Sequence, residues 1–275
     1  MLAENTYATR DGTDLYLLCS LPNNPKAILI FIHGLGEHIG RYKDYFAFFH
    51  KNEIGCVGFD LRGHGKSDGQ RGHSPGYEYL MDDIQEIASS VNQSYSETPL
   101  FIYGHSMGGN LGLNFLIRRN PSELRGGIIT SPWIKLRIKP SSIQLLLAKI
   151  MHKIFPSFSE RNSLDPAHLS RDSEIGETYQ QDPLVHDKIS AGLFTEMVEA
   201  GRFVLDHAQE LKLPVLLIHG EADPITSPEA SKSFADKTPD CVKFQPFPDM
   251  LHETHNEIGK EQVYQTVLSW LEEKL

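Results

Sequence analysis

Short apolar runs recur along the chain, and segments with helical periodicity separate them. Before the first run, residues 5–21 surround Asp11-Gly12, which predicts an N-terminal β-hairpin. Near-continuous apolar strands alternating with helices are typical of a parallel sheet that helices cover on both faces. We therefore expect an α/β fold whose ligand site lies beyond the carboxyl ends of the strands. The apolar runs cover residues 27–33, 55–60, 100–104, 126–130, 214–220 and 242–247.

Residues 131–210 interrupt this alternation. They contain a helical stretch over residues 141–155 with a broad apolar face, a polar run over residues 159–183, and a second helix. An apolar face of this kind is compatible with a helix of the hydrophobic core. Its position between two predicted strands instead favours an insertion packed over the strand ends. The sequence therefore predicts an α/β core formed by residues 1–130 and 211–275, with residues 131–210 as a cap.

Composition and charge exclude several classes of protein. The chain has 26 Lys and Arg against 36 Asp and Glu, a net charge of -10, which argues against nucleic acid as a partner. Its 3 cysteines show no C-x-x-C spacing, so neither a disulfide framework nor a zinc knuckle is expected. The first residues lack the pattern of a signal peptide, and no apolar run approaches the roughly 20 residues that span a bilayer. We expect a soluble, cytoplasmic protein.

Gly104-His105-Ser106-Met107-Gly108 matches the pattern G-x-S-x-G and lies between a predicted strand and a predicted helix. The small residues allow a tight turn that exposes the Ser106 hydroxyl at the top of the sheet. The N-terminus of the following helix faces the same place, and its free N–H groups favour an oxyanion. The alternative is a glycine-rich turn with an incidental serine, and the flanking strand and helix argue against it. Ser106 is therefore the predicted nucleophile.

A serine hydroxyl needs a base to take its proton, and G-x-S-x-G predicts a carboxylate and then a histidine further along the chain. Asp223 follows the strand over residues 214–220, and His252 follows the last predicted strand. Asp223 would hold the imidazole in one tautomer and stabilise the imidazolium. Asp249 is an alternative acid, but it lies in the same loop as the histidine. We therefore predict Asp223 as the acid and His252 as the base.

The loop after the first core strand reads His33-Gly34-Leu35-Gly36-Glu37-His38. In this architecture that loop supplies one N–H group to an oxyanion hole, and the residue after the nucleophile supplies the other. The predicted donors are the backbone amides of Leu35 and Met107. A metal site built from His33, Glu37 and His38 is a rival interpretation, but no Cys or third His stands at metal-ligand spacing.

Residues 249–257, DMLHETHNE, come close to the zinc-protease pattern H-E-x-x-H but are one residue short. The histidines stand at i and i+3, and no third ligand is expected nearby, so we predict no metal here. His252 is preferred as the base. His255 is expected to support the loop from a helix start, and Glu257 to act as a cap or packing partner.

These motifs together resemble the monoglyceride lipase and lysophospholipase branch of the α/β-hydrolase superfamily, the serine aminopeptidase S33 type. The match runs almost from end to end of the chain. The string H-G-x-G-E-H-x-x-R-Y is far more specific than G-x-S-x-G, which many esterases share. The matching segments are HGLGEHIGRY at 33–42, FDLRGHGKSDGQRG at 59–72, GHSMGG at 104–109, DPLV at 182–185, HGEADPITSP at 219–228 and HETHNE at 252–257.

The resemblance implies a fatty-acyl ester hydrolase that uses no metal and no organic cofactor. It assigns Ser106, Asp223 and His252 to the triad. Leu35 stands where many family members have a smaller residue, which is expected to narrow the alcohol side of the pocket. The positions that the family uses around a glycerol head group correspond here to Glu37, Arg41 and His105.

The expected function is therefore hydrolysis of fatty-acyl glycerol esters, with monoacylglycerol as the first candidate substrate and a small-molecule lipid as the partner. A lysophospholipase or a broad carboxylesterase is the nearest alternative, and the acidity of the chain gives the first of these little support. C–C hydrolases, haloperoxidases and thioesterases share the scaffold, but Glu37, His38 and Arg41 argue against them. A non-catalytic binding protein should show a broken triad. The apolar helix 141–155 is expected to contact a membrane surface transiently.

Overall fold

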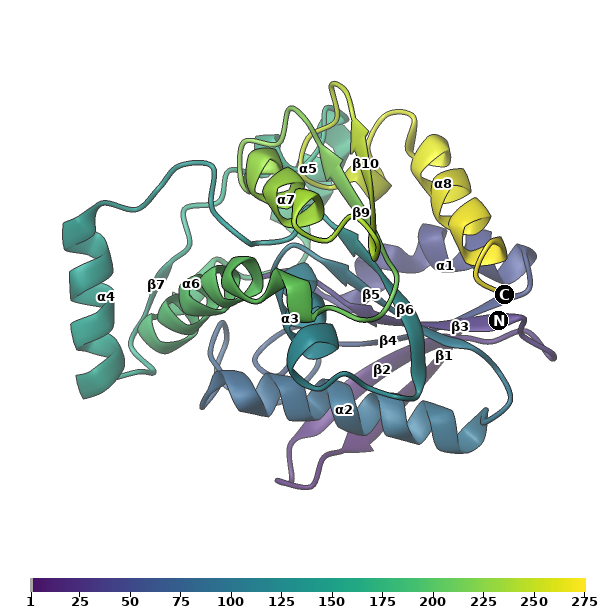
Figure 1. The fold of residues 1–275 in the computed structure, drawn as a ribbon. Helices are drawn as coiled ribbons and strands as arrows, with labels where there is room; N and C mark the ends of the chain where they lie inside the picture. The colour runs from purple at the N-terminus through teal and green to yellow at the C-terminus, as the bar shows by residue number, and fades with distance from the viewer. Residues whose placement is uncertain (1) are drawn as a thin grey trace.

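The computed structural model describes residues 2–275, and its centre is a single eight-stranded sheet with the order β1-β2-β4-β3-β5-β6-β9-β10 (Figure 1). β1 and β2 form the expected hairpin, and β2 also runs antiparallel to β4. All other pairs in this sheet are parallel, which confirms the predicted α/β class. The strands are β1 (Leu2–Ala8), β2 (Asp14–Ser20), β3 (Ala27–Ile32), β4 (Ile54–Phe59), β5 (Leu100–His105), β6 (Leu124–Thr130), β9 (Val215–Gly220) and β10 (Val242–Phe247).

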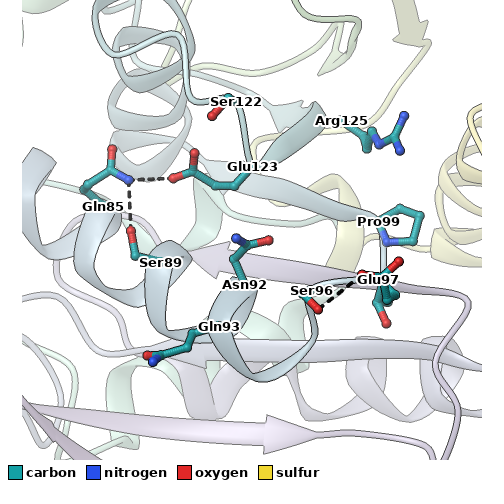
Figure 2. A pocket seen from close by; sticks show the side chains of 11 residues that line it. Gln85, Ser89, Asn92, Gln93, Ser96, Glu97, Pro99, Ser122, Glu123 and Arg125 are labelled. Atoms are coloured by element: carbon teal, nitrogen blue, oxygen red, sulfur yellow. Dashed lines mark hydrogen bonds between the residues drawn. The ribbon is translucent and has the colours of Figure 1, made fainter.

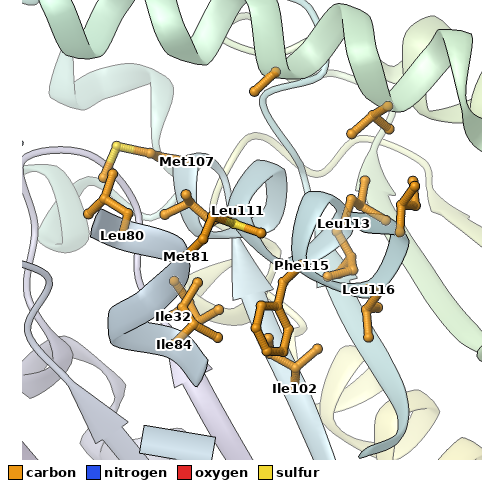
Figure 3. Close-up of a cluster of buried hydrophobic side chains, with 14 of the residues drawn as sticks. Ile32, Leu80, Met81, Ile84, Ile102, Met107, Leu111, Leu113, Phe115 and Leu116 are labelled. Carbon is orange, nitrogen blue, oxygen red and sulfur yellow. The ribbon is translucent and has the colours of Figure 1, made fainter. Parts of the chain in front are cut away.

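Two apolar layers cover the two faces of the sheet. Along β3, Ile28, Ile30 and Ile32 face one layer, while Leu29 and Phe31 face the other, because successive side chains of a strand point to opposite faces. The first layer contains residues from α2 (Tyr77–Ser94) and α3 (Met107–Arg118), as Figure 3 shows. The second contains residues from α1 (Lys43–Lys51) and α8 (Lys260–Glu272). Burial on both faces explains why the strands read as continuous apolar runs.

The chain between β6 and β9 contains the two helices expected there and several shorter elements. α6 (Ala191–Asp206) packs on α3, and its buried side chains belong to the first apolar layer. The remaining elements are α4 (Ser142–Ile154), β7 (Ser159–Arg161), α5 (Ser173–Gln181), β8 (Lys188–Ser190) and two short 3-10 helices, Pro166–His168 and Ala208–Glu210. β7 and β8 pair as a small second sheet. α7 (Pro228–Asp236) follows β9.

α4 differs from every core helix in its exposure. None of its residues is buried, and Ile143, Leu146 and Ile154 expose 70%, 60% and 76% of their surface. The helix begins at a capping box, in which Ser141 and Gln144 exchange hydrogen bonds, and it ends just before Pro156. It lies at the outer edge of the molecule beside α6 (Figure 1). The apolar face of this helix therefore does not serve the hydrophobic core.

No helix within residues 2–275 is both long and apolar enough to cross a membrane.

Candidate active site

Ser106 stands at the sharp turn between β5 and α3, with φ 54° and ψ -115°. A positive φ is costly for a residue with a side chain, so close packing must hold it in place. A Cβ atom on Gly108 would overlap the carbonyl oxygen of Ile32, and one on Gly104 would overlap that of Gly108. The glycines of the motif are therefore required because β3, the turn and α3 approach one another closely.

Ser106, His252 and Asp223 form a continuous hydrogen-bonded line. The Ser106 Oγ atom lies 2.9 Å from His252 Nε2, and His252 Nδ1 lies 2.7 Å from Asp223 Oδ2. All three residues are buried, and each comes from the carboxyl end of a different parallel strand, β5, β10 and β9. Ser131 donates a hydrogen bond from Oγ to the carbonyl oxygen of His252 at 2.7 Å, which anchors the histidine loop.

Asp223 stays ionised in spite of its burial. Burial alone would raise its pKa, but His252 and His219 hold the pKa of this carboxyl well below its usual range. The backbone N–H groups of Ile225 and Thr226 also donate to Asp223 Oδ1, at 2.7 and 3.1 Å. Hydrogen bonds of this kind favour the charged form of a carboxylate.

The charge on Asp223 determines the tautomer of His252. An ionised carboxylate only accepts hydrogen bonds, so Nδ1 must carry the proton and Nε2 is left to accept from the Ser106 hydroxyl. Burial alone would lower the pKa of His252, and the neighbouring Asp223 outweighs burial and raises it. This geometry can remove the hydroxyl proton of Ser106 and store it as an imidazolium that Asp223 stabilises.

The two predicted oxyanion amides lie beside Ser106. A Cβ atom on Gly34 would come within 3.2 Å of Ser106 Cβ, so the loop after β3 touches the serine. Within residues 2–275, neither the Leu35 N–H nor the Met107 N–H donates a hydrogen bond to another protein group. Met107 is the first residue of α3, where backbone N–H groups have no partner inside the helix.

His33 fixes the orientation of the Leu35 amide. Its Nε2 accepts from the Leu61 N–H at 2.9 Å, so its Nδ1 carries the proton and donates to the Gly34 carbonyl at 2.7 Å. In a trans peptide the N–H points opposite to the C=O, so the Leu35 N–H is held pointing away from His33. Burial lowers the pKa of His33 to about 3, which keeps this tautomer neutral.

Glu37 and Arg41 belong to a buried ionic cluster that also contains Glu253. Arg41 Nη1 donates to Glu37 Oε2 at 2.7 Å and to Glu253 Oε1 at 2.6 Å. Glu37 and Glu253 line the cavity above Ser106, whereas Arg41 lies behind them and does not line it. Glu253 is a residue of this site that is absent from those predicted from the sequence, although its place directly after His252 is a signal for it.

His105 and His255 pack around the base without contacting Ser106 through hydrogen bonds. The His105 ring lies 4.8 Å from both the His252 and the His255 rings, and its Nδ1 lies 3.0 Å from Thr130 Oγ1. His255 stacks on Tyr42 at 4.7 Å, and burial lowers its pKa to about 3. Of the two histidines in the DMLHETHNE segment, only His252 reaches the serine.

Glu257 does not cap α8, whose N-cap residue is Gly259. It accepts hydrogen bonds from the Leu251 N–H at 2.8 Å and from the Arg171 side chain at 3.1 Å, so of the two roles predicted for it only that of a packing partner fits. Among the residues that the structure describes, no group of three or more His, Cys, Asp or Glu is arranged to hold a metal ion.

A cavity of about 640 Å³ opens above Ser106. Near the serine its wall is polar and contains Glu37, His105 and Glu253. Farther away, the wall is largely apolar and is built by residues of the 131–210 segment and its flanks. These apolar residues include Trp133, Leu136, Leu147, Met151, Phe158, Ile189 and Phe194, and the same segment also contributes the charged side chains of Lys139, Glu160, Arg161 and Asp165.

A second depression of about 720 Å³ lies between the end of α2 and the start of β6 (Figure 2). Its wall is mainly polar, and Gln85 donates to Glu123 across it at 2.5 Å. It lies at the amino ends of β5 and β6, whereas Ser106 lies beyond the carboxyl end of β5. In a parallel sheet the carboxyl ends carry the ligand site, so this depression is separate from the candidate active site.

The fold and this site define an α/β serine hydrolase. Residues 23–259 match the family model Hydrolase_4, described as serine aminopeptidase, S33, and the chain belongs to that family. An uncharacterised abhydrolase domain-containing protein of Dictyostelium discoideum is 41% identical over 97% of this chain. The chain spans only 28% of the length of that relative.

Two further relatives cover both chains almost completely. The monoacylglycerol lipase of Mycolicibacterium smegmatis is 27% identical over 98% of this chain and 96% of its own. The crystal structure of the Paleococcus ferrophilus monoacylglycerol lipase is 30% identical, covers 100% of both chains and superposes with a TM-score of 0.85. These similarities confirm the family that the sequence motifs indicated.

The contact between Asp223 and His252 predicts the titration of the histidine. In Asp223→Asn the pKa of His252 should fall, because the carboxylate that most strongly stabilises the imidazolium is removed while the burial that disfavours it remains. Histidine side-chain NMR across a pH series measures this value in both proteins. An unchanged His252 titration in the variant would contradict the assignment.

The same contact predicts a pH-dependent stability difference. Because the folded-state pKa of His252 is raised, its contribution to stability is fully present below pH 6.5 and is lost as the pH rises through the folded-state pKa. Because the folded-state pKa of Asp223 is lowered, its contribution is fully present above pH 3.8 and is lost as the pH falls through the folded-state pKa. Wild type should therefore exceed Asp223→Asn in unfolding free energy most strongly between these two values. Urea unfolding in that window and at alkaline pH checks the sign.

Proposed function

We propose that this chain is a monoacylglycerol lipase, which hydrolyses the ester between a fatty acid and glycerol through an acyl-enzyme on Ser106. The observation that carries the proposal is the line of Ser106, His252 and Asp223 at the floor of a cavity with one polar and one apolar end. The monoacylglycerol lipases among its relatives, which match the chain along almost its whole length, support the same substrate.

In the first half of the proposed reaction, His252 takes the proton of Ser106 as the oxygen attacks the ester carbonyl. The Leu35 and Met107 amides then stabilise the negative charge on the carbonyl oxygen. A donor of this kind is typically worth about 3 kcal/mol of transition-state stabilisation. His252 next gives its proton to the glycerol oxygen, and glycerol leaves.

Water completes the reaction by the same steps. His252 removes a proton from the water as it attacks the acyl group on Ser106, and the two amides again hold the oxyanion. When the tetrahedral species collapses, the proton returns to the Ser106 oxygen and the fatty acid leaves. No metal ion or organic cofactor takes part in this proposed cycle.

The two ends of the cavity suggest how the substrate lies. The apolar end is suited to the acyl chain, and the polar end with Glu37 and His105 is suited to glycerol hydroxyl groups. In this proposal residues 131–210 are a cap that closes over the acyl chain. The exposed apolar side chains of α4 would let the cap touch a lipid surface.

A lysophospholipase is the main competing function, and the charges at the polar end disfavour it. A phosphate-containing head group needs free cationic donors near Ser106. The cations that line the cavity, Lys139 and Arg161, belong to the 131–210 segment, whereas Glu37 and Glu253 are the charged groups in the loops of the Leu35 amide and of His252. Arg41 already donates to both carboxylates from behind. A neutral glycerol head group fits these acceptors better.

The proposal predicts that Ser106→Ala loses roughly six powers of ten in turnover of monoacylglycerol, because the nucleophile is absent. Purified wild type and variant are compared on monoacylglycerols of several chain lengths, beside lysophosphatidylcholine. Faster hydrolysis of lysophosphatidylcholine than of any monoacylglycerol would overturn the proposed substrate. Near-normal activity in Ser106→Ala would overturn the mechanism.

The position of Met151 predicts a change in chain-length preference. Met151 lines the apolar end of the cavity, so Met151→Trp should lower kcat/KM for long acyl chains and spare short ones, since the larger ring occupies the space. Ile154 lies on the same helix but outside the cavity wall, which makes Ile154→Trp the matched control. Equal losses on short and long chains would contradict the proposed acyl site.

A further inference from the structure

The loop that carries the proposed oxyanion amide and the loop that carries the proposed base are joined by buried charges. Glu37 lies in the first loop, two residues after Leu35. Glu253 lies in the second, directly after His252. Arg41 lies between them, in the short helix Ile39–Tyr42. Their side chains expose 3%, 2% and 9% of their surface, so water does not separate them.

A chain of short hydrogen bonds runs through this cluster. The Gly34 N–H donates to Glu37 Oε1 at 2.6 Å, and Arg41 Nη1 donates to Glu37 Oε2 at 2.7 Å. Arg41 then binds both oxygens of Glu253, from Nη1 to Oε1 at 2.6 Å and from Nη2 to Oε2 at 2.8 Å. The path connects the N–H group of Gly34, the residue before Leu35, to Glu253, the residue after His252.

The backbone around this path is held at both ends. In the first loop, Glu37 orients the Gly34 N–H, and His33 orients the next peptide. In the second loop, the Glu253 N–H donates to the carbonyl oxygen of Leu169 at 2.7 Å. The Arg41 guanidinium also lies over the Tyr179 ring, 4.9 Å from its centre. The hydrogen-bonded path from Glu253 therefore ends on Gly34, the residue whose carbonyl group forms the peptide bond to Leu35.

Stability alone is a weak reason for such a cluster. Removing charges from water costs several kcal/mol for each ion, and well-packed apolar side chains in place of a buried ion pair are often equally stable. Here two carboxyl groups share one guanidinium, and burial together with the neighbouring Glu253 raises the pKa of Glu37. A planar guanidinium that binds a carboxylate with two parallel hydrogen bonds does, however, fix the relative geometry of the groups it joins.

We propose that Glu253 is a positioning residue, which through Arg41 and Glu37 holds the His252 imidazole and the Leu35 amide in register around Ser106. The proposal rests on the function proposed above, because it assigns Glu253 a role in the same acyl transfer. Glu253 also lines the cavity, so the rival role is direct contact with the glycerol head group.

The test compares Glu253→Gln with wild type on a monoacylglycerol and on p-nitrophenyl acetate, which has no glycerol. Glutamine keeps the shape but loses one acceptor and the charge, so the bidentate contact with Arg41 is lost. A positioning role predicts that kcat falls about 10- to 100-fold on both substrates by the same factor, with KM little changed. A loss confined to the monoacylglycerol would overturn the proposal in favour of head-group contact.

Glu257→Gln is the matched control, because Glu257 is an equally buried acid of the same loop that contacts Arg171 instead of Arg41. It should turn over both substrates at close to the wild-type rate. Losses as large as those of Glu253→Gln would show a general disturbance of the loop and overturn the proposal, as would full activity of Glu253→Gln.

Arg41→Lys provides a second variant if Glu253→Gln does not fold. Lysine keeps the charge but cannot bind Glu253 with two parallel hydrogen bonds, so kcat should again fall on both substrates. Unchanged turnover in a folded Arg41→Lys would overturn the proposal. Failure of the proposed function is distinct, because wild type itself would then not hydrolyse the monoacylglycerol, whatever the variants do on p-nitrophenyl acetate.

Discussion

The strained backbone of Ser106 is the constraint on which the rest of the site depends. Its φ of 54° is held by the close packing of β3, β5 and α3, which is possible only because Gly104 and Gly108 have no side chains. The same close approach brings the loop after β3 against the serine and directs the first N–H groups of α3 toward it. One local geometry thus places the nucleophile and both proposed oxyanion donors together.

The electrostatics of the site follow from burial around that turn. Asp223 and His252 lie in a low-dielectric environment, where a carboxylate and an imidazolium interact more strongly than in water. The ionised Asp223 fixes the His252 tautomer, and the neutral His33 fixes the Leu35 amide. The Glu37–Arg41–Glu253 cluster then connects the two loops that carry these groups. The site is therefore arranged before any substrate binds, which is how fixed dipoles lower a reaction barrier.

Much of this arrangement could be predicted from local sequence, and the rest depends on contacts that sequence does not display. The apolar runs predicted every parallel strand. The motif G-x-S-x-G, placed between a strand and a helix, predicted the turn at Ser106 and, with it, an acid and then a histidine further along the chain. The Arg41–Glu253 contact joins residues 212 positions apart, so no periodicity reveals it. Helical periodicity predicted α4, but periodicity alone does not distinguish an apolar face outside the core from a buried one. The role of Glu257 was harder to predict, because its partner Arg171 is distant from it in the sequence.

Activation of the Ser106 hydroxyl by His252 can be measured by covalent labelling. The chain is treated with a fluorophosphonate, which reacts with activated serines, and the modified peptide is located by mass spectrometry after digestion. If His252 activates Ser106, one adduct is expected, on Ser106, and it should form much more slowly in His252→Ala and at an undiminished rate in Ile154→Trp. An adduct on another serine, or an equal labelling rate in His252→Ala, would contradict this activation.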